Sequence, residues 1–164
     1  MKTRKLCICA LTAALYAAIT VMAAPLSYGA VQFRLSEALV VLCRFEPSLW
    51  LGLTLGCLIA NFFSTVTALD VVIGTAATAL GCFLTVKIRS DFLAPLANAL
   101  VNTVLVGGML AYVLSADNWL AGFAAVSLQI GIGEITVMYA LGLPLLLFAK
   151  KTDFMKKLMG TEKI

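Results

Sequence analysis

The stretch Gln32-Phe33-Arg34-Leu35-Ser36-Glu37 decides how this chain can fold, because it places an amide, a guanidinium and a carboxylate in an otherwise apolar sequence. Hydrophobic residues make up 62% of the 164 residues, charged residues make up 12%, and the mean hydropathy is +1.04. Such a chain has too few polar side chains to cover a soluble domain. A charge near the membrane interior costs roughly 2.5–3.5 kcal/mol on insertion scales, so it usually faces a bundle interior or a cavity. The stretch therefore predicts a membrane protein with an internal site for a small polar molecule.

Apolar runs around this stretch have the length of membrane-spanning helices, which need about 20 residues to cross roughly 30 Å of hydrocarbon. We predict an all-α membrane protein in which a single domain, 1–164, contains six transmembrane helices. The second run is short, so the loop before it is expected to dip toward the bilayer. The last run is too long for one perpendicular span and is expected to tilt, kink or begin with an extracellular helical piece. The predicted spans are 6–24, 31–45, 47–64, 69–86, 91–114 and 118–149.

The first 30 residues also resemble a secretory signal peptide, with a basic head, an apolar stretch and small residues near Val21–Ala24. The apolar stretch is about 19 residues long, which exceeds the usual signal core of about 7–15. We therefore expect the first helix to be retained.

The lysines and arginines are distributed unevenly over this topology. With both termini in the cytoplasm, every basic residue except Arg34 falls on the cytoplasmic side, as the positive-inside rule requires. The residues after Ala149 form a basic, amphipathic tail, 150–164, that is expected to rest on the inner leaflet. The sequence thus predicts a multi-pass protein of the cell membrane and isolates Arg34 as a residue with another purpose. The cytoplasmic basic residues are Lys2, Arg4, Lys5, Arg44, Lys87, Arg89, Lys150, Lys151, Lys156, Lys157 and Lys163.

Most polar residues of the predicted spans fall in the outer half of the bilayer, on separate helices, which favours one cavity that opens outward. Alternatives stay open for some of them. Arg34 and Glu37 could form an i,i+3 ion pair, and Asp70 could lie in an extracellular turn. Asn98 and Asn102 could be hydrogen-bond contacts between helices, which we favour for Asn98. The candidate substrate-binding residues are Gln32, Phe33, Arg34, Glu37, Asn61, Asp70, Thr78, Asn102 and Glu134.

Other residue types argue against an enzyme or a metalloprotein. The chain has no histidine, which excludes His-dependent triads and His-based metal sites. Its five cysteines are scattered through apolar runs and are expected to be small buried hydrophobic residues. We therefore expect no cofactor, no metal and no catalytic residue.

Two strips of small residues would let helices approach one another closely. The strip in the first span is long and uninterrupted, and we expect it to contact a different protein. The strip in the third span is expected to serve internal packing. The first comprises Ala10, Ala14 and Ala18, and the second comprises Gly52, Gly56 and Ala60.

Several of these motifs resemble those of the QueT family, the substrate-binding (S) components of energy-coupling-factor (ECF) transporters for queuosine precursors. The resemblance runs from about Thr12 to Lys150. It rests on the opening hexapeptide, on Gly56-Cys57-Leu58-Ile59-Ala60-Asn61, and on Asp70 followed by Gly74-Thr75-Ala76-Ala77-Thr78. The alanine strip resembles the surface on which S components dock their transmembrane partner, a feature of the superfamily more than of this family.

The resemblance implies a six-helix bundle with an outward-facing site capped by the loop between the first two helices. It implies a 7-deazaguanine substrate, such as the 7-cyano or 7-aminomethyl form, or queuine. It also implies uptake driven by a transmembrane coupling protein and two cytoplasmic ATPases, with the S component toppling in the membrane. The chain has no Gly-x-x-x-x-Gly-Lys-Ser/Thr loop, so ATP hydrolysis would occur in a partner.

A guanine-like ring also fits the candidate residues on chemical grounds. Its adjacent N–H donors suit a carboxylate, and its carbonyl oxygen suits an arginine or an amide. Glu37 or Glu134 could accept from the donor edge, and Asp70 or the other carboxylate could pair with an aminomethyl cation. The carbonyl partner could be Arg34, Gln32, Asn61 or Asn102.

Four other functions compete with this interpretation. The nearest is an S component for another vitamin, such as riboflavin, thiamine, biotin or niacin, which would share the fold and the docking surface. A small secondary transporter is the second, although we find none of the inverted repeats that such proteins often show. An intramembrane enzyme or a purely structural membrane protein fits the polar residues less well.

Overall fold

The computed structural model describes residues 3–28, 32–64 and 67–152. These residues contain helices, turns and short linkers, and no strand. The predicted basic tail lies outside the described residues from 153 onward, and the first two of its residues still belong to the last helix. The elements are α1 (Thr3–Met22), α2 (Ala24–Ser27), η1 (Leu35–Arg44), α3 (Leu49–Asn61), α4 (Leu69–Lys87), α5 (Leu93–Leu114), η2 (Ala116–Asn118), α6 (Trp119–Val137), η3 (Met138–Gly142) and α7 (Leu143–Lys151).

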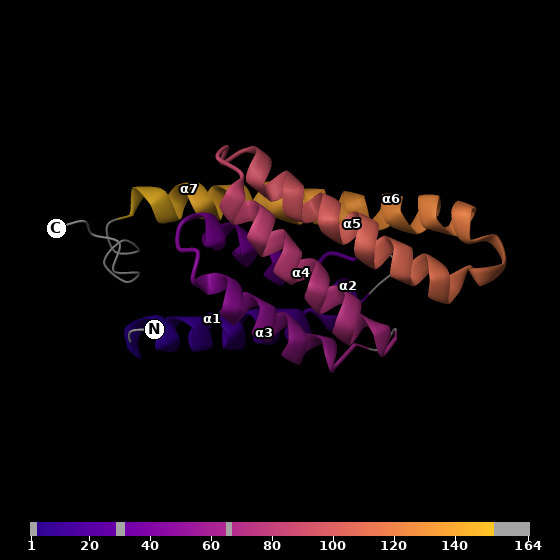
Figure 1. Cartoon of the computed structure of the whole chain (residues 1–164), viewed down its shortest axis with the longest axis horizontal. Coiled ribbons are helices and arrows are strands. Elements are labelled where there is room, and N and C mark those ends of the chain that lie inside the picture. The colour runs from indigo at the N-terminus through magenta and orange to yellow at the C-terminus, as the bar shows by residue number, and fades with distance from the viewer. Residues whose placement is uncertain (1–2, 29–31, 65–66, 153–164) are drawn as a thin grey trace.

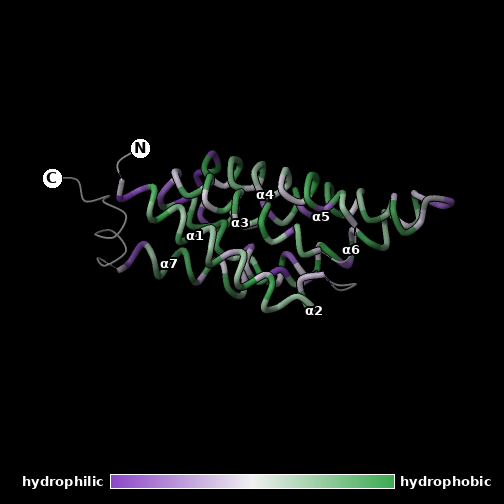
Figure 2. Tube along the Cα trace, turned by 90° about the horizontal axis from the view of Figure 1, so that it is seen from below, coloured by the Kyte–Doolittle hydropathy of each residue, from purple (hydrophilic) through white to green (hydrophobic). Residues whose placement is uncertain are grey.

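The long helices lie side by side along one axis, and the start of α1 and the end of α7 lie at the same end of the bundle (Figure 1). The hairpin formed by α5 and α6 extends past the other helices at the opposite end. Hydrophobic residues follow all the helices, whereas hydrophilic stretches gather near the two ends of the bundle (Figure 2). This distribution is the one expected for helices that cross a hydrocarbon layer.

Among the described residues, four helical segments are long and apolar enough to cross a membrane, namely Thr3–Met22, Leu69–Lys87, Leu93–Leu114 and Trp119–Lys151. The other two predicted spans are shorter. Helix α3 has 13 residues, which gives roughly 20 Å of length, against about 30 Å of hydrocarbon. Helix α3 is therefore shorter than the hydrocarbon layer, whereas its neighbours α1 and α4 have 20 and 19 residues.

The second predicted span, 31–45, is not an α-helix. It forms the 3-10 helix η1 over ten residues, Leu35–Arg44, after an extended linker at 32–34. A 3-10 helix rises about 2.0 Å per residue, so ten residues reach roughly 20 Å instead of the 15 Å of an α-helix. Its residues 36–43 are all buried, so the element runs through the middle of the bundle.

The last predicted span is one continuous helical segment with an irregular turn near its middle. Helix α6 passes through η3, a π-helical turn at Met138–Gly142, into α7. Pro144 stands two residues after the end of this turn. Proline has no N–H to donate, and in a regular α-helix its ring would clash with the carbonyl four residues earlier. The π-turn accommodates the proline, so the expected irregularity lies at Gly142 and Pro144.

Glycines let α1 and α3 pack closely. A Cβ on Gly52 would lie 2.4 Å from the carbonyl oxygen of Cys9, and one on Gly56 would lie 2.6 Å from that of Ala13. The prediction that the glycine strip serves internal packing is confirmed. The alanine strip lies on the opposite face of α1, because Ala10, Ala14 and Ala18 are all exposed.

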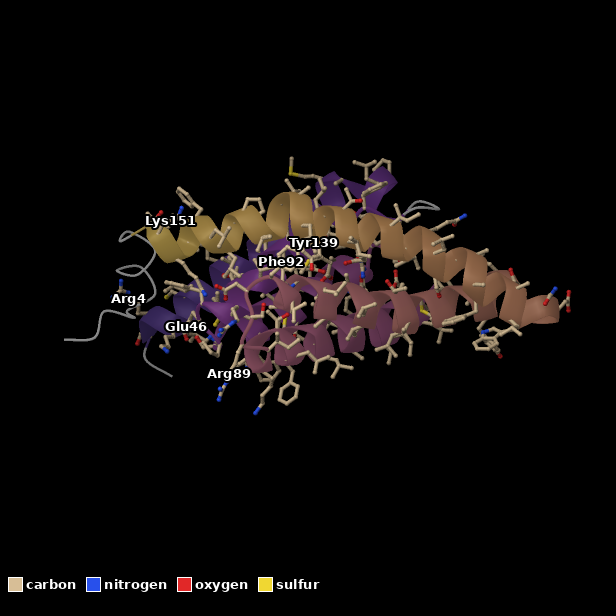
Figure 3. All side chains as sticks on the ribbon, turned by 90° about the horizontal axis from the view of Figure 1, so that it is seen from above. Arg4, Glu46, Arg89, Phe92, Tyr139 and Lys151 are labelled. Carbon is tan, nitrogen blue, oxygen red and sulfur yellow. The ribbon has the colours of Figure 1, made fainter. Side chains whose placement is uncertain are left out.

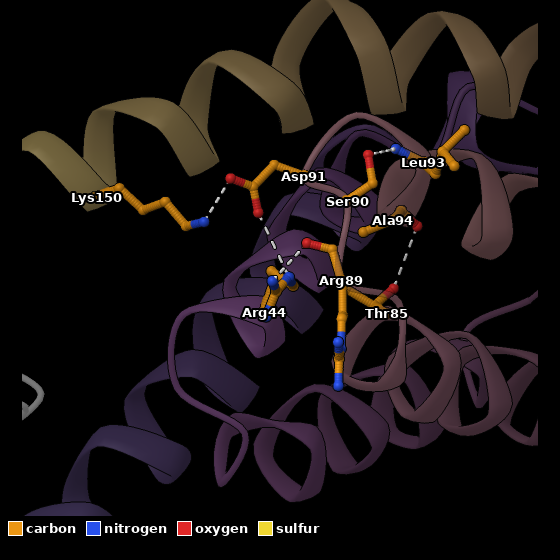
Figure 4. A network of polar contacts seen from close by, with 8 residues as sticks. All are labelled: Arg44, Thr85, Arg89, Ser90, Asp91, Leu93, Ala94 and Lys150. Carbon is orange, nitrogen blue, oxygen red and sulfur yellow. Dashed lines mark hydrogen bonds and ion pairs between the residues drawn. The ribbon is translucent and has the colours of Figure 1, made fainter.

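Ion pairs tie the helix ends together at the end of the bundle where α1 begins, which we call the basic end. Lys5 contacts Glu46 with 3.0 Å between Nζ and Oε1. Asp91, between α4 and α5, accepts from Lys150 of α7 and lies 3.4 Å from Nε of Arg44 (Figure 4). The loops that follow η1 and α4 therefore meet α1 and α7 here.

Candidate functional site

Arg34 is the largest of the fully buried side chains in the described part of the chain, with 1% of its surface exposed. It stands in the extended linker just before η1, and its Nη2 donates a hydrogen bond to Oδ1 of Asn61 at the end of α3. The Asn61 amide donates in turn to the carbonyl oxygen of Asp70, at 3.0 Å. Arg34 thus connects the linker to α3 and, through Asn61, to the first turn of α4.

Asp70 is 1% exposed and lies in the first turn of α4, not in an exposed turn. Its Oδ2 accepts a hydrogen bond of 2.8 Å from the Ser64 hydroxyl. A Cβ on Gly74 would lie 2.8 Å from Oδ1 of Asp70 and 3.5 Å from Nη1 of Arg34. Gly74 therefore leaves the space into which both charged groups point.

Glu37, in the first turn of η1, is fully buried and accepts hydrogen bonds from three helices. Its Oε1 accepts from the hydroxyls of Tyr16 on α1 and Thr78 on α4, the latter at 2.9 Å. Its Oε2 accepts from the amides of Asn98, at 3.0 Å, and Asn102, at 3.5 Å, both on α5. Four donors to one carboxylate satisfy its acceptor sites and stabilise the buried charge.

Cys57 connects these two groups of residues. Its sulfur accepts from the Asn61 amide at 3.3 Å and lies 3.2 Å from the Thr78 hydroxyl oxygen. The expectation that the cysteines are small buried hydrophobic residues is therefore wrong for Cys57, which belongs to the polar network, and for Cys7, which is exposed.

Glu134 approaches the network from α6 and is 2% exposed. It interacts electrostatically with both Glu37 and Arg34. The neighbouring Gly133 brings α6 against the linker, since a Cβ there would lie 2.5 Å from the carbonyl oxygen of Gln32. Seven elements, the linker included, thus contribute charged or polar side chains to one buried region.

Several charged atoms in this region have no hydrogen-bond partner within the described part of the chain. They are Nε and Nη1 of Arg34, Oδ1 of Asp70 and Oε2 of Glu134, together with the side-chain oxygens of Asn98 and Asn102. The described residues also contain no ion pair between Arg34 and Glu37, which was one interpretation of the hexapeptide. Leaving a buried polar atom unpaired costs about 1–3 kcal/mol, and more when it is charged. The arrangement favours a polar molecule with both donors and acceptors.

The structure brings together the predicted site residues Arg34, Glu37, Asn61, Asp70, Thr78, Asn102 and Glu134, with Gln32 also buried beside them. Phe33 is half-buried, and its backbone N–H donates to Leu26. Three other aromatic residues lie elsewhere. Phe62 is 71% exposed, and Trp50 is 44% exposed. The Tyr139 hydroxyl donates to the carbonyl of Phe92, further along the bundle than Lys151 and Glu46 (Figure 3).

Sequence reasoning missed Tyr16, whereas the interpretation of Asn98 as a hydrogen-bond contact between helices is confirmed, because Asn98 of α5 donates to Glu37 of η1. A signal for Tyr16 was present in the sequence, because Thr12, Tyr16 and Thr20 repeat every fourth residue of an apolar helix. All three are buried, and the Thr20 hydroxyl lies 2.6 Å from that of Ser36. Within the described residues, no group of three or more acidic or cysteine side chains is arranged to hold a metal ion.

Comparison with known proteins now adds to this geometry. The sequence profile of the QueT transporter family matches residues 6–151. The chain belongs to the QueT transporter family. Family membership and the long apolar helices make it a multi-pass integral membrane protein of the cell membrane, and confirm the resemblance seen in the motifs.

One curated relative is the queuosine precursor transporter QueT of Lactococcus lactis subsp. cremoris (strain MG1363), which is 35% identical over 97 residues. The aligned part covers 56% of this chain and 57% of that protein, so the chain spans little more than half of the relative's length. No solved structure matches the chain.

Proposed function

We propose that this chain is the substrate-capture subunit of an ECF-type importer that takes up a queuosine precursor of the 7-deazaguanine class. The observation that carries the proposal is the set of unpaired charged atoms on Arg34, Asp70 and Glu134 in one buried region. The relative's description as a queuosine precursor transporter supports the choice of substrate.

The ring of a 7-deazaguanine matches the donors and acceptors that the protein leaves free. Its N1–H and exocyclic N2–H point the same way and suit a carboxylate, while its carbonyl oxygen needs a donor. Glu134 can accept the two N–H groups, because Oε2 has no partner among the described residues. Arg34 can donate Nη1 or Nε to the carbonyl, and Asp70 Oδ1 can accept from an aminomethyl group.

Glu37 has a different part in this proposal. Its carboxylate already accepts from four protein donors, which leaves it little capacity for ligand N–H groups. We assign it the task of fixing Thr78 and Asn102, whose side chains border the same region.

The exposed alanine strip is proposed as the docking surface for a transmembrane coupling protein. The strip offers a flat surface with no side chain beyond Cβ at three positions one turn apart. The chain contains no phosphate-binding loop for ATP, so two partner ATPases would supply the energy. The positive-inside rule then places the basic end in the cytoplasm and the candidate site nearer the outside.

Binding assays on the purified full-length chain test the substrate. Calorimetric titration with 7-cyano-7-deazaguanine, 7-aminomethyl-7-deazaguanine and queuine is expected to show binding of at least one, with riboflavin, thiamine, biotin and niacin inert. Binding of one of these vitamins and of no deazaguanine would refute the substrate. Uptake into proteoliposomes that lack the ATPases would instead identify a secondary transporter.

The docking surface needs a separate test. Ala14→Leu should abolish co-purification with the coupling protein while leaving substrate binding unchanged, because Ala14 is exposed and lies outside the site. Ala125→Leu makes the same change at an exposed position of α6 and should have no effect. Equal co-purification of both variants would place the partner on another face.

A further inference from the structure

A surface groove lies at the basic end, away from the candidate site. It is a groove of about 460 Å³ between the start of α3 and the last two turns of α4. Trp50 and Phe83 line it with apolar surface, and Lys87 provides a charge at the end of α4. None of the groove's residues takes part in the polar network around Arg34 and Glu37.

Lys87 lines this groove without a carboxylate partner, and a second cation, Arg89, follows it in the chain. Nζ of Lys87 lies 5.5 Å from the ring centroid of Phe83, a cation–π contact that holds the ammonium over the apolar lining. Arg89, two residues further on, extends its guanidinium away from the neighbouring ion-pair network (Figure 4). Neither side chain forms an ion pair within the described part of the chain, because Asp91 is shared by Arg44 and Lys150.

The depth of the groove in a membrane follows from the short helix beside it. With 13 residues, α3 covers roughly 20 Å of a hydrocarbon layer about 30 Å thick. The bilayer must adapt to such a short span by thinning locally or by filling the gap. Trp50, near the first residue of α3, is 44% exposed, and tryptophan is enriched where hydrocarbon meets headgroups. The apolar lining of the groove and the ammonium of Lys87 therefore lie at the depth of the lipid headgroups.

We propose that this groove binds an anionic phospholipid of the leaflet next to the basic end. An acyl chain would lie against Trp50, Ala79 and Phe83, and the phosphate would lie between Lys87 and Arg89. The volume falls within the 300–1,000 Å³ typical of pockets that hold small molecules. Charge complementarity selects a lipid with a net negative headgroup over a zwitterionic one.

Native mass spectrometry can test the proposal on the full-length chain, reconstituted in equal amounts of phosphatidylglycerol and phosphatidylcholine and then extracted in mild detergent. The wild type is expected to retain phosphatidylglycerol preferentially. Lys87→Gln should lower that retention about fivefold, the factor expected for one basic residue at a membrane surface. Lys151→Gln removes an equal charge from the exposed end of α7 and should leave retention unchanged.

A second variant tests the acyl part of the site separately from the charge. Ala79→Leu would fill the groove from the α4 side and should lower retention of both lipids. Thermal unfolding of each variant shows whether the fold is intact. Equal retention of both lipids by the wild type, or equal loss in Lys87→Gln and Lys151→Gln, would overturn the proposal. So would normal lipid retention by Lys87→Gln together with lost binding of the coupling protein, which would make the groove a protein contact.

Discussion

The buried carboxylate of Glu37 should determine the stability of the bundle through its four donors. In Glu37→Leu, Tyr16 and Thr78 lose their shared acceptor, and the amides of Asn98 and Asn102 lose theirs. Removing the central member of a buried charged network costs about 3–5 kcal/mol. For a chain of this length, each kcal/mol shifts Tm by roughly 2–4 °C, so the melting temperature should fall by about 6–20 °C.

A double-mutant cycle separates this network from general packing. Tyr16→Phe removes one hydrogen bond to a charged acceptor and should cost about 1.5–3 kcal/mol, or roughly 3–12 °C. In the Glu37→Leu background, Tyr16→Phe should cost little, because its acceptor is already gone. Thr103→Val controls for the loss of a hydroxyl, since Thr103 donates only to Ala99 one turn earlier.

The assay is thermal unfolding of the purified chain in detergent, followed by tryptophan fluorescence and by circular dichroism at helical wavelengths. Additive losses in the double variant would refute the reasoning, as would a Glu37→Leu variant that melts like the wild type. Either result would mean that packing, and not the carboxylate, holds α1 and α5 to η1.

Two further predictions concern the packing of α1 and the pH dependence of the basic end. Gly52→Ala should prevent the close approach of α1 and α3 and lower both yield and Tm, because its Cβ would overlap the α1 backbone; Gly108→Ala, where the nearest atom is 3.6 Å away, should be tolerated. Burial raises the pKa of Glu46, but hydrogen bonds from Ser48 and Lys5 outweigh it, so that the pKa lies below its ordinary value. The folded state then gains stability from Glu46 above the unfolded pKa, near 4.3, and loses it as the pH falls through the lower folded pKa. The Tm advantage of wild type over Glu46→Gln should therefore be present at pH 7 and decline as the pH falls below about 4.3, and an advantage that grows as the pH falls would contradict this assignment.

Hydropathy and charge predicted the order of the helices well, because both depend on composition along the chain. The predicted spans beginning near residues 69 and 91 match α4 and α5 within two residues at their starts. The face shared by Asp70, Gly74 and Thr78 was also predictable, since residues four apart lie on one side of an α-helix.

The form of η1 could not be predicted in the same way. Its sequence, Leu35–Arg44, has the apolar character of a short α-helical span, and the 3-10 geometry emerges only from its position between the other helices. The π-turn before Pro144 was partly predictable, because proline interrupts the hydrogen bonds of a helix wherever it stands.

The partners of Glu37 were the hardest to predict. Tyr16 and Asn98 lie 21 and 61 residues away from it in sequence, and their contacts depend on how α1 and α5 are rotated about their axes. The rotation of each helix follows from close packing at residues such as Gly56 and Gly81. A Cβ on Gly81 would lie 1.8 Å from the side-chain oxygen of Asn98. Periodicity shows which side of a helix is buried, but not which residue it meets.

Substitution of Glu134 tests the central claim most directly, with the affinity for a 7-deazaguanine measured by calorimetry on the purified full-length chain. Glu134→Gln keeps the shape of the side chain but removes the carboxylate proposed to accept the ring N–H groups. The account predicts a loss of affinity of at least about tenfold, near 1.4 kcal/mol, with an unchanged melting temperature. Wild-type affinity in Glu134→Gln would contradict it and place the substrate elsewhere.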